Sequence, residues 1–257
     1  MSAVFASWNS FWTFERAVRF SSRFLHDESV ISFLRAVTDS TAKRCATVAK
    51  DRAFWRAQLG HDWRERTQDE TSWDEPAPFG EARMKPLRHS AHEGRINPRG
   101  IPCLYAASDK ETAIAEVRPW LSALVSVAQM STVKELRLVN CTDGHDTNLD
   151  FHCEEPTPAV REDTVWRNIG PAFSNPVAND PGIAEYVPTQ ILAEHFRKQN
   201  FDGVAYKSKL GPGLNIALFD LDAMDVYDLR LYPVTAVRYE IGEVQDSYPV
   251  RRKKTDA

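Results

Sequence analysis

The amino-acid sequence predicts an α+β fold, in which N-terminal helices precede a domain of small mixed sheets and short helices. Two observations lead to this prediction. Apolar residues recur at helical spacing through the first fifty residues, whereas the later apolar runs have the length of strands and alternate with loops and brief helical segments. Short strands and short helices mixed along one chain are typical of the α+β class. With 257 residues, the chain is long enough for one large domain or one domain with an extension.

The first fifty residues are expected to form two helices. Phe11, Phe14 and Val18 recur at helical spacing, and a second apolar series runs over residues 30–37. Asp27 or Ser29 is a suitable N-cap for the second helix. The aromatic residues of this segment are expected to pack on the main domain. A surface for a partner protein and a contact between two copies of the chain are the alternatives.

Residues 94–118 contain three changes of structure. The segment begins with a turn-rich loop that carries Arg95, and a short buried strand ending near Tyr105 is expected over residues 101–106. A helix follows this strand directly. The sequence therefore predicts a compact loop–strand–helix unit.

The helix of this unit is expected to begin at Ser108, with Glu111 completing a capping box, and to end before Pro119. At 100° per residue, Glu116 lies just off the apolar face, on the same flank as Thr112. Because most charged helix residues are solvated, geometry alone favours a glutamate at the rim, paired with a lysine or arginine. The alternative is a carboxylate that faces a cleft beside the core.

The other elements follow from the same periodicities. A strand that opens the main domain is expected at residues 54–57, and the polar segment at residues 60–92 is expected to be a long loop without regular structure. A connection of this length is often functional, for instance as a lid. The remaining expected elements are a strand at residues 136–141, a short helix at residues 158–168, a helix at residues 190–199 capped by Thr189, adjacent strands at residues 204–208 and 216–219 around a glycine-rich loop, and a last strand at residues 234–241.

The composition argues against several classes of protein. A net charge of −4 is unusual for a dedicated nucleic-acid binder, and no apolar run is long enough to span a membrane. The N-terminus lacks the basic and apolar regions of a signal peptide, and four scattered cysteines fit a reducing cytoplasm. His152, Cys153 and Glu154 are adjacent, but His145 lies further off than the usual ligand spacing, so no metal site is expected.

Two ordered blocks of the sequence resemble the RES domain, a family named for its Arg, Glu and Ser. The first block contains Arg95, Tyr105 in LYAAS and Glu116 in TAIAEV. The second consists of YVPTQILAEHF, then FDGVAYKS, which ends in Ser208, and then LNIALFD. Two blocks with several fixed residues each are much more specific than one short motif. The resemblance covers about residues 54–241 and implies a fold similar to the core of ADP-ribosyltransferase toxins.

On this basis the chain is expected to divide into three parts. These are a helical N-terminal extension at residues 1–50, a RES domain at residues 51–245 and a C-terminal tail at residues 246–257. The tail contains the basic run RRKK, which is more typical of a solvated terminus than of a nucleic-acid patch.

The resemblance implies an enzyme that destroys NAD, because the family includes NAD-degrading toxins of RES–Xre toxin–antitoxin pairs. Cleavage of the nicotinamide–ribose bond builds positive charge on the ribose, as in glycoside cleavage. The reaction needs a guanidinium for the pyrophosphate, an aromatic or hydroxyl group for the ribose, and a carboxylate near the anomeric carbon. Arg95, Tyr105 and Glu116 are therefore the expected catalytic set, with NAD as the substrate and no cofactor.

Four further residues are expected to support substrate binding. Ser208 is suited to bind ribose or phosphate, and Arg56, which follows an aromatic residue as at the start of RES domains, is a second candidate for binding a phosphate. Asn97 and Asn215 are supporting candidates, and their alternatives are a turn residue and a strand-start residue.

The sequence does not identify the nucleophile that attacks the ribose. Water gives ADP-ribose, inorganic phosphate gives ADP-ribose 1″-phosphate, and a protein side chain makes the chain a protein ADP-ribosyltransferase. RES proteins resemble enzymes that use water or phosphate more than they resemble protein ADP-ribosyltransferases. Arg56, Arg95 and Arg99 are candidates to hold a phosphate co-substrate.

A non-catalytic module that binds NAD or ADP-ribose is the alternative to an enzyme. An Xre-type antitoxin and a second copy of the chain are the candidate protein partners.

Overall fold

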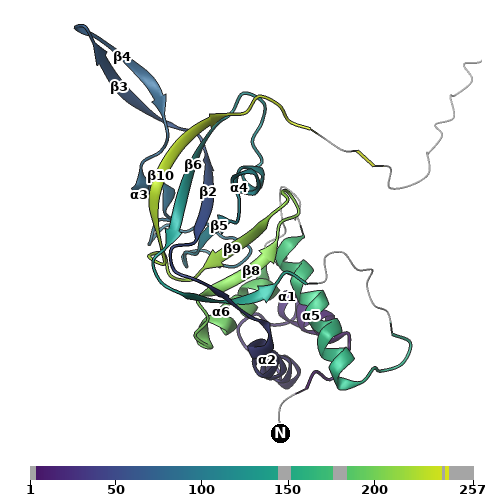
Figure 1. Ribbon diagram of the computed structural model, residues 1–257. Coiled ribbons are helices and arrows are strands. Elements are labelled where there is room, and N and C mark those ends of the chain that lie inside the picture. Colours follow the sequence, from purple (N-terminus) through teal and green to yellow (C-terminus); the bar gives the residue numbers. More distant parts are fainter. Residues whose placement is uncertain (1–3, 144–151, 176–183, 239–240, 243–257) are drawn as a thin grey trace, which may run out of the picture.

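Eight strands form the main sheet of the computed structural model, which describes residues 4–143, 152–175, 184–238 and 241–242. The strands are β1 (Cys45–Val48), β2 (Ala53–Leu59), β5 (Leu104–Ala107), β6 (Leu124–Thr132), β7 (Leu136–Cys141), β8 (Gly203–Lys207), β9 (Leu214–Leu218) and β10 (Met224–Pro233). Their order is β1-β7-β8-β9-β5-β2-β6-β10 (Figure 1). Strands β7 and β8 are parallel, and the other neighbours are antiparallel. The predicted α+β class is confirmed, with most strands in one mixed sheet.

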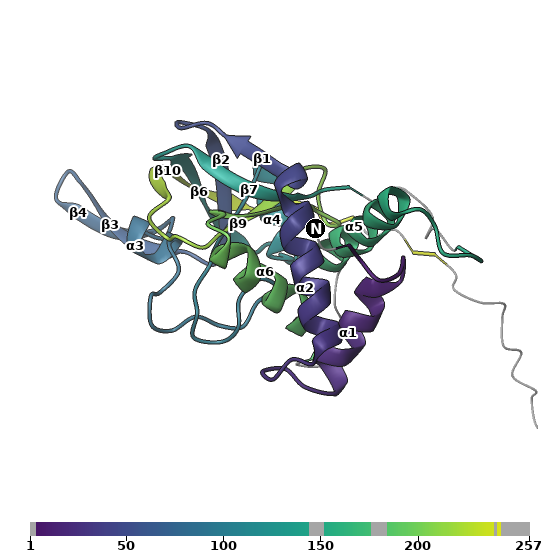
Figure 2. The ribbon, with the colours of Figure 1, turned by 90° about the horizontal axis from the view of Figure 1, so that it is seen from below.

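Helices pack against this sheet at two places, beside β7 and β8 and beside β2 (Figure 2). They are α1 (Ser10–Phe20), α2 (Glu28–Thr41), α3 (Glu81–Met84), α4 (Lys110–Glu116), α5 (Pro158–Ser174) and α6 (Val187–Lys198). The helix predicted at residues 158–168 continues to Ser174, although Pro171 lies inside it. Among the described residues, no helix is long and apolar enough to cross a membrane. No group of three potential metal-binding side chains comes together there either.

The N-terminal helices share a core with the rest of the protein, as expected from their aromatic residues. Asp27 caps α2 by accepting a hydrogen bond from the Val30 backbone N–H at 3.0 Å. Phe14 of α1 stacks on Phe33 of α2 with 4.5 Å between ring centroids, and both belong to the cluster that contains Phe196 of α6. The division of the chain at residue 50 stays a prediction.

Residues 60–92 are not a structureless loop, and that expectation is wrong. Strands β3 (Asp62–Gln68) and β4 (Thr71–Ala77) form an antiparallel hairpin that projects from the main sheet (Figure 1). Asp69 and Glu70 at its tip both have positive φ angles, 49° and 65°, as the favoured two-residue hairpin turns require. Because nearly all of the hairpin is exposed on both faces, its sequence carries no apolar alternation that would reveal strands.

The end of the main sheet also differs from the expectation. The last strand is β10, which ends at Pro233, whereas residues 234–238 are not in a strand. Strand β10 pairs along its length with β6, and a register shift lies between Val226 and Asp228. Neither β6 nor β10 was predicted from the sequence. Strand β10 mixes charged and apolar residues, and only its pairing with β6 makes it a strand.

Three features of the sequence lie outside the described residues. These are His145, the C-terminal tail at residues 246–257 and the basic run within it.

Candidate active site

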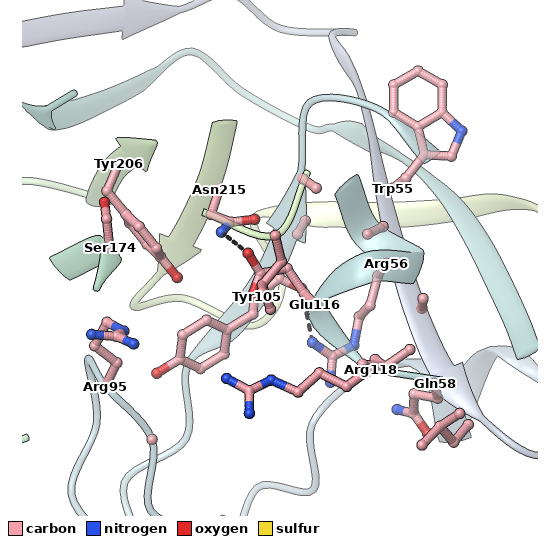
Figure 3. Close-up of a pocket in the computed structure, with 18 of the residues that line it drawn as sticks. Trp55, Arg56, Gln58, Arg95, Tyr105, Glu116, Arg118, Ser174, Tyr206 and Asn215 are labelled. Atoms are coloured by element: carbon pink, nitrogen blue, oxygen red, sulfur yellow. Dashed lines mark hydrogen bonds between the residues drawn. The ribbon is translucent and has the colours of Figure 1, made fainter. Parts of the chain in front are cut away.

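A cavity of about 770 Å³ lies where β2, β5, β9 and α4 meet (Figure 3). Its lining includes most of the side chains that the sequence singles out, together with others that it does not. The polar and aromatic lining residues are Trp55, Arg56, Gln58, Arg95, Tyr105, Glu116, Arg118, Ser174, Tyr186, Tyr206 and Asn215.

Glu116 is the acidic residue of this lining, at the last position of α4. Its Oε1 atom accepts hydrogen bonds from the Ser208 hydroxyl at 2.7 Å and from the Asn215 side-chain amide at 2.6 Å. The other oxygen, Oε2, has no hydrogen-bond partner among the described residues. Two donors on one oxygen fix the orientation of the carboxylate and leave its second oxygen for a ligand.

Ser208 is buried and is not part of the lining, which differs from the direct substrate contact expected for it. Its hydroxyl donates to Glu116 and accepts from the backbone N–H groups of Leu210 and Gly211 at 3.1 and 3.0 Å. The side chain therefore connects the carboxylate to the loop between β8 and β9, and its hydrogen-bonding capacity is used within the protein.

Helix α4 is held by a cap and by close contact with that loop. The N-cap is Asp109, whose carboxylate accepts from the Thr112 backbone N–H at 2.7 Å, so the capping box predicted at Ser108 is wrong. Ser108 instead accepts from the Leu214 backbone N–H at 2.9 Å. A Cβ atom at Gly213 would collide with the Asp109 carboxylate. Glycine is required there because the loop backbone touches the start of α4.

Tyr105 of β5 contributes its ring to the cavity, while its hydroxyl is engaged elsewhere. The hydroxyl donates to the Asn97 Oδ1 atom at 2.7 Å and accepts from the Ile96 backbone N–H at 3.0 Å. Asn97 is buried, is not part of the lining, and donates to the His92 carbonyl at 2.9 Å. Asn97 therefore holds the loop against Tyr105, which differs from the substrate contact expected for it. A Cβ atom at Gly94 would lie 2.7 Å from both side chains.

Arg95 lies at the opposite side of the cavity from Glu116 in Figure 3. Its guanidinium donates to the Ala172 carbonyl at 3.0 Å and stacks over Tyr186, 5.5 Å from the ring centroid. Its own carbonyl accepts a 2.6 Å hydrogen bond from Thr189. Thr189 is not the N-cap of α6, because the helix begins at Val187. Its hydroxyl fixes the loop that carries Arg95.

Arg56 of β2 is the most deeply placed guanidinium of the lining. One terminal nitrogen donates to the Tyr105 carbonyl at 2.8 Å (Figure 3). The buried Nε atom has no hydrogen-bond partner among the residues that the structure describes. Burial lowers the pKa of Arg56 to about 10, so the side chain is still a cation at neutral pH. A buried cation with an unused donor is suited to bind an anion.

Arg118 and Tyr206 are two of the lining residues that were not predicted from the sequence. Arg118 follows α4 with a φ of 46°, a left-handed conformation that is uncommon for residues other than glycine. Tyr206 of β8 is buried, and burial, together with the charge of Glu116, raises the pKa of its hydroxyl, so Tyr206 stays protonated. Signals were present: Arg118 stands two residues after Glu116, and Tyr206 stands two before Ser208. Arg99, by contrast, is exposed and does not line the cavity.

Comparison with known proteins identifies the family. The model of the RES domain matches residues 53–241, most of the chain. No curated protein matches the chain. A chain in the crystal structure of the M. tuberculosis MbcT–MbcA toxin–antitoxin complex is similar to this one, with 15% sequence identity and a TM-score of 0.40. The match covers 75% of this chain and 89% of that chain. From the extent of the family match, the protein belongs to the RES domain family.

Proposed function

We propose that the protein cleaves the nicotinamide–ribose bond of NAD. The observation that carries this proposal is Glu116, which shares a cavity with three arginines. One of its carboxylate oxygens is fixed by Ser208 and Asn215, and the other has no partner among the described residues. A fixed carboxylate is suited to stabilise positive charge on a ribose, and the arginines are suited to bind phosphates.

The size and charge of the cavity support this substrate class. Its volume of about 770 Å³ lies within the range of about 300–1,000 Å³ typical of small-molecule sites. Arg56, Arg95 and Arg118 bring three positive charges against the one negative charge of Glu116. The excess of positive charge matches the pyrophosphate of NAD. The aromatic rings of Tyr105 and Tyr206 offer flat surfaces for the ribose and nicotinamide.

In the proposed reaction the C–N bond to nicotinamide breaks, and nicotinamide leaves as a neutral molecule with the bonding electrons. Positive charge then develops on the ribose, beside the Glu116 carboxylate. The nucleophile adds to the anomeric carbon, and water must lose a proton in this step, for which Glu116 is the acceptor within the cavity. Arg95 is the proposed ligand of the pyrophosphate, and the neutral Tyr206 hydroxyl is a proposed hydrogen-bond donor to the substrate.

Inorganic phosphate is a second candidate for the nucleophile, besides water. The buried Nε atom of Arg56 has no hydrogen-bond partner in the part of the chain that the structure describes, and Arg118 adds a further guanidinium to the lining. Three arginines exceed what one pyrophosphate needs, which favours a second anion in the same cavity. Phosphorolysis then yields ADP-ribose 1″-phosphate, whereas hydrolysis yields ADP-ribose.

The test is to incubate the purified protein with NAD, with and without phosphate, and to measure NAD loss and product mass. Glu116→Gln is the matched variant, because its side-chain oxygen can still accept from Ser208 and Asn215. We expect the rate of NAD loss to fall by about a hundredfold or more in this variant. Undiminished activity of Glu116→Gln excludes the carboxylate role. Stable NAD with wild-type protein under both conditions favours a non-catalytic module that binds NAD or ADP-ribose.

The biological role that the family resemblance suggests is that of a toxin held inactive by an Xre-type antitoxin. We propose this role together with the chemistry, and its test is expression in a bacterial host. Wild-type protein is expected to stop growth and deplete NAD, whereas Glu116→Gln is expected to do neither. Protein labelled with ADP-ribose, instead of free product, is the result that assigns the alternative activity of a protein ADP-ribosyltransferase.

A further inference from the structure

The side-chain amide of Gln190 lies at a junction between α6, the loop that carries Arg95 and the N-terminal segment. Gln190 is buried, with 1% of its surface exposed. Its Nε2 group donates to the Glu93 carboxylate at 2.9 Å, to the Gly94 carbonyl at 2.9 Å and to the Asn97 carbonyl at 3.2 Å. Its Oε1 atom accepts from the Arg23 guanidinium at 2.6 Å. Acceptors on one side and a donor on the other fix the orientation of this amide.

The loop at residues 93–97 belongs to no helix or strand and depends on α6 for its position. The carbonyls of Gly94 and Asn97 accept from Gln190, and the carbonyl of Arg95 between them accepts from Thr189. Two adjacent residues of α6 therefore hold three of the loop carbonyls. The backbone position from which Arg95 reaches the cavity is set by this contact.

Arg23 supplies the donor to the oxygen of the Gln190 amide. It lies outside residues 53–241, which match the family model. It follows α1, in a segment held by hydrogen bonds from the Leu25 backbone N–H to the Ser22 hydroxyl and between His26 and the Arg23 carbonyl. Without Arg23, the oxygen of a buried amide loses its charged donor, and the amide is free to turn away from the loop.

We propose that Arg23 and Gln190 are positioning residues for the substrate site, through which the N-terminal segment fixes the loop of Arg95. This inference rests on the proposed function in so far as Arg95 is taken to bind the pyrophosphate. Such binding is made in both the ground state and the transition state, so its loss raises KM more than it lowers kcat. Loss of one charged hydrogen bond to a buried group corresponds to about a tenfold change in affinity.

The experiment compares full-length wild type with Arg23→Met, Arg23→Lys, Gln190→Met and the control Arg35→Met. Arg35 is an exposed arginine of the same N-terminal region whose ion pair is with Glu28. We expect Arg23→Met and Gln190→Met to speed amide hydrogen exchange in residues 93–97 and to raise KM for NAD about tenfold, with kcat changed less than threefold. Arg23→Lys restores part of the effect, and Arg35→Met matches wild type.

Hydrogen exchange separates this inference from the proposed function. Should wild-type protein leave NAD intact, the exchange rates of residues 93–97 still decide whether Arg23 holds the loop. If Arg23→Met exchanges at the wild-type rate in residues 93–97, the inference is overturned, even if loss of activity in Glu116→Gln supports the proposed enzyme. Faster exchange with an unchanged KM also overturns it, because loosening of the loop then has no effect on substrate binding. If Gln190→Met does not fold, Arg23→Met still tests the inference, because Arg23 is half-buried and its substitution leaves the core intact.

Discussion

Glu116 acquires its orientation from two other elements of the chain. Ser208 follows β8 and Asn215 belongs to β9, and both donate to the same oxygen of a carboxylate on α4. Each of these residues is a plausible candidate from the sequence, but their common target is a property of the packed structure. Ser208 and Asn215 therefore fix the orientation of this carboxylate. Asn215 also lines the cavity itself.

Arg118 combines an unfavourable backbone with a position in the lining of the cavity. A non-glycine residue in the left-handed region costs about 1 kcal/mol, and its φ is 46°. We expect Arg118→Gly to raise KM for NAD about tenfold, through loss of one guanidinium, without lowering the melting temperature. Enzyme kinetics and thermal unfolding check the two parts separately.

Arg118→Lys is the control for this prediction, because it keeps both the positive charge and the unfavourable backbone. It is expected to show an intermediate KM and an unchanged melting temperature. An Arg118→Gly variant with the wild-type KM removes Arg118 from the substrate site.

At the scale of elements, α4 is seated on the glycine-rich loop between β8 and β9. Gly213→Ala is expected to destabilise the protein by about 2 kcal/mol, because the new Cβ atom collides with Asp109 and displaces the helix cap. Gly80→Ala is the matched control, since a Cβ atom there meets nothing within 4 Å. Urea denaturation of both variants measures the effect, and equal stability of the two contradicts the close packing.

His195 connects α6 to α2. Its Nε2 atom lies 2.9 Å from the Leu34 carbonyl and 2.8 Å from the Thr38 hydroxyl. Burial lowers the pKa of His195 below the ordinary histidine value of 6.5. Below that pH the unfolded chain binds a proton that the folded protein does not, so the free energy of unfolding falls as the pH falls. At higher pH the ring is neutral in both states, and this loss disappears.

The measurement is urea denaturation of wild type and His195→Gln between pH 7.5 and pH 5. We expect the wild type to lose more stability over this range, since the glutamine does not titrate. If the free energy of unfolding falls equally with pH in the two proteins, the titration of His195 does not contribute to the loss of stability in acid.

At the scale of the whole molecule, the N-terminal helices are part of the core. Phe11, Phe14, Phe33 and Val37 are buried in the cluster that also holds α5 and α6. At about 2 kcal/mol each, their burial contributes about 8 kcal/mol, which is comparable to the total stability of about 5–15 kcal/mol for a typical domain. We expect deletion of residues 1–50 to give unfolded or aggregated protein, as judged by circular dichroism and light scattering.

A folded, soluble protein that lacks residues 1–50 contradicts this prediction. If this variant is a monomer and the wild type is a dimer, the segment is a contact between two copies of the chain instead. If the number of chains per particle is the same in both proteins, the segment serves neither the core nor a dimer.

Local sequence signals were sufficient for helices α1, α2, α4, α5 and α6 and for strands β2, β5, β7, β8 and β9, but they missed β1, β6 and the short helix α3. The periodicity of Phe11, Phe14 and Val18 predicted α1, and of the two proposed caps of α2, Asp27 or Ser29, the structure has Asp27. The signals failed for the β3–β4 hairpin and for β10. In both, charged residues stand where apolar alternation would mark a strand, and pairing between strands takes its place.

The sequence by itself determined the α+β class, the family and the identity of the expected carboxylate, because these depend on periodicity and on residues at fixed spacing. The tertiary structure decided which side chains share the cavity. It brought Arg118 and Tyr206 into the lining and left Asn97, Arg99 and Ser208 out of it. It also connected Arg23, through Gln190, to the loop of Arg95. The physical reason is that these contacts join residues far apart in the chain, and only the packing of helices on a twisted sheet sets which of them meet.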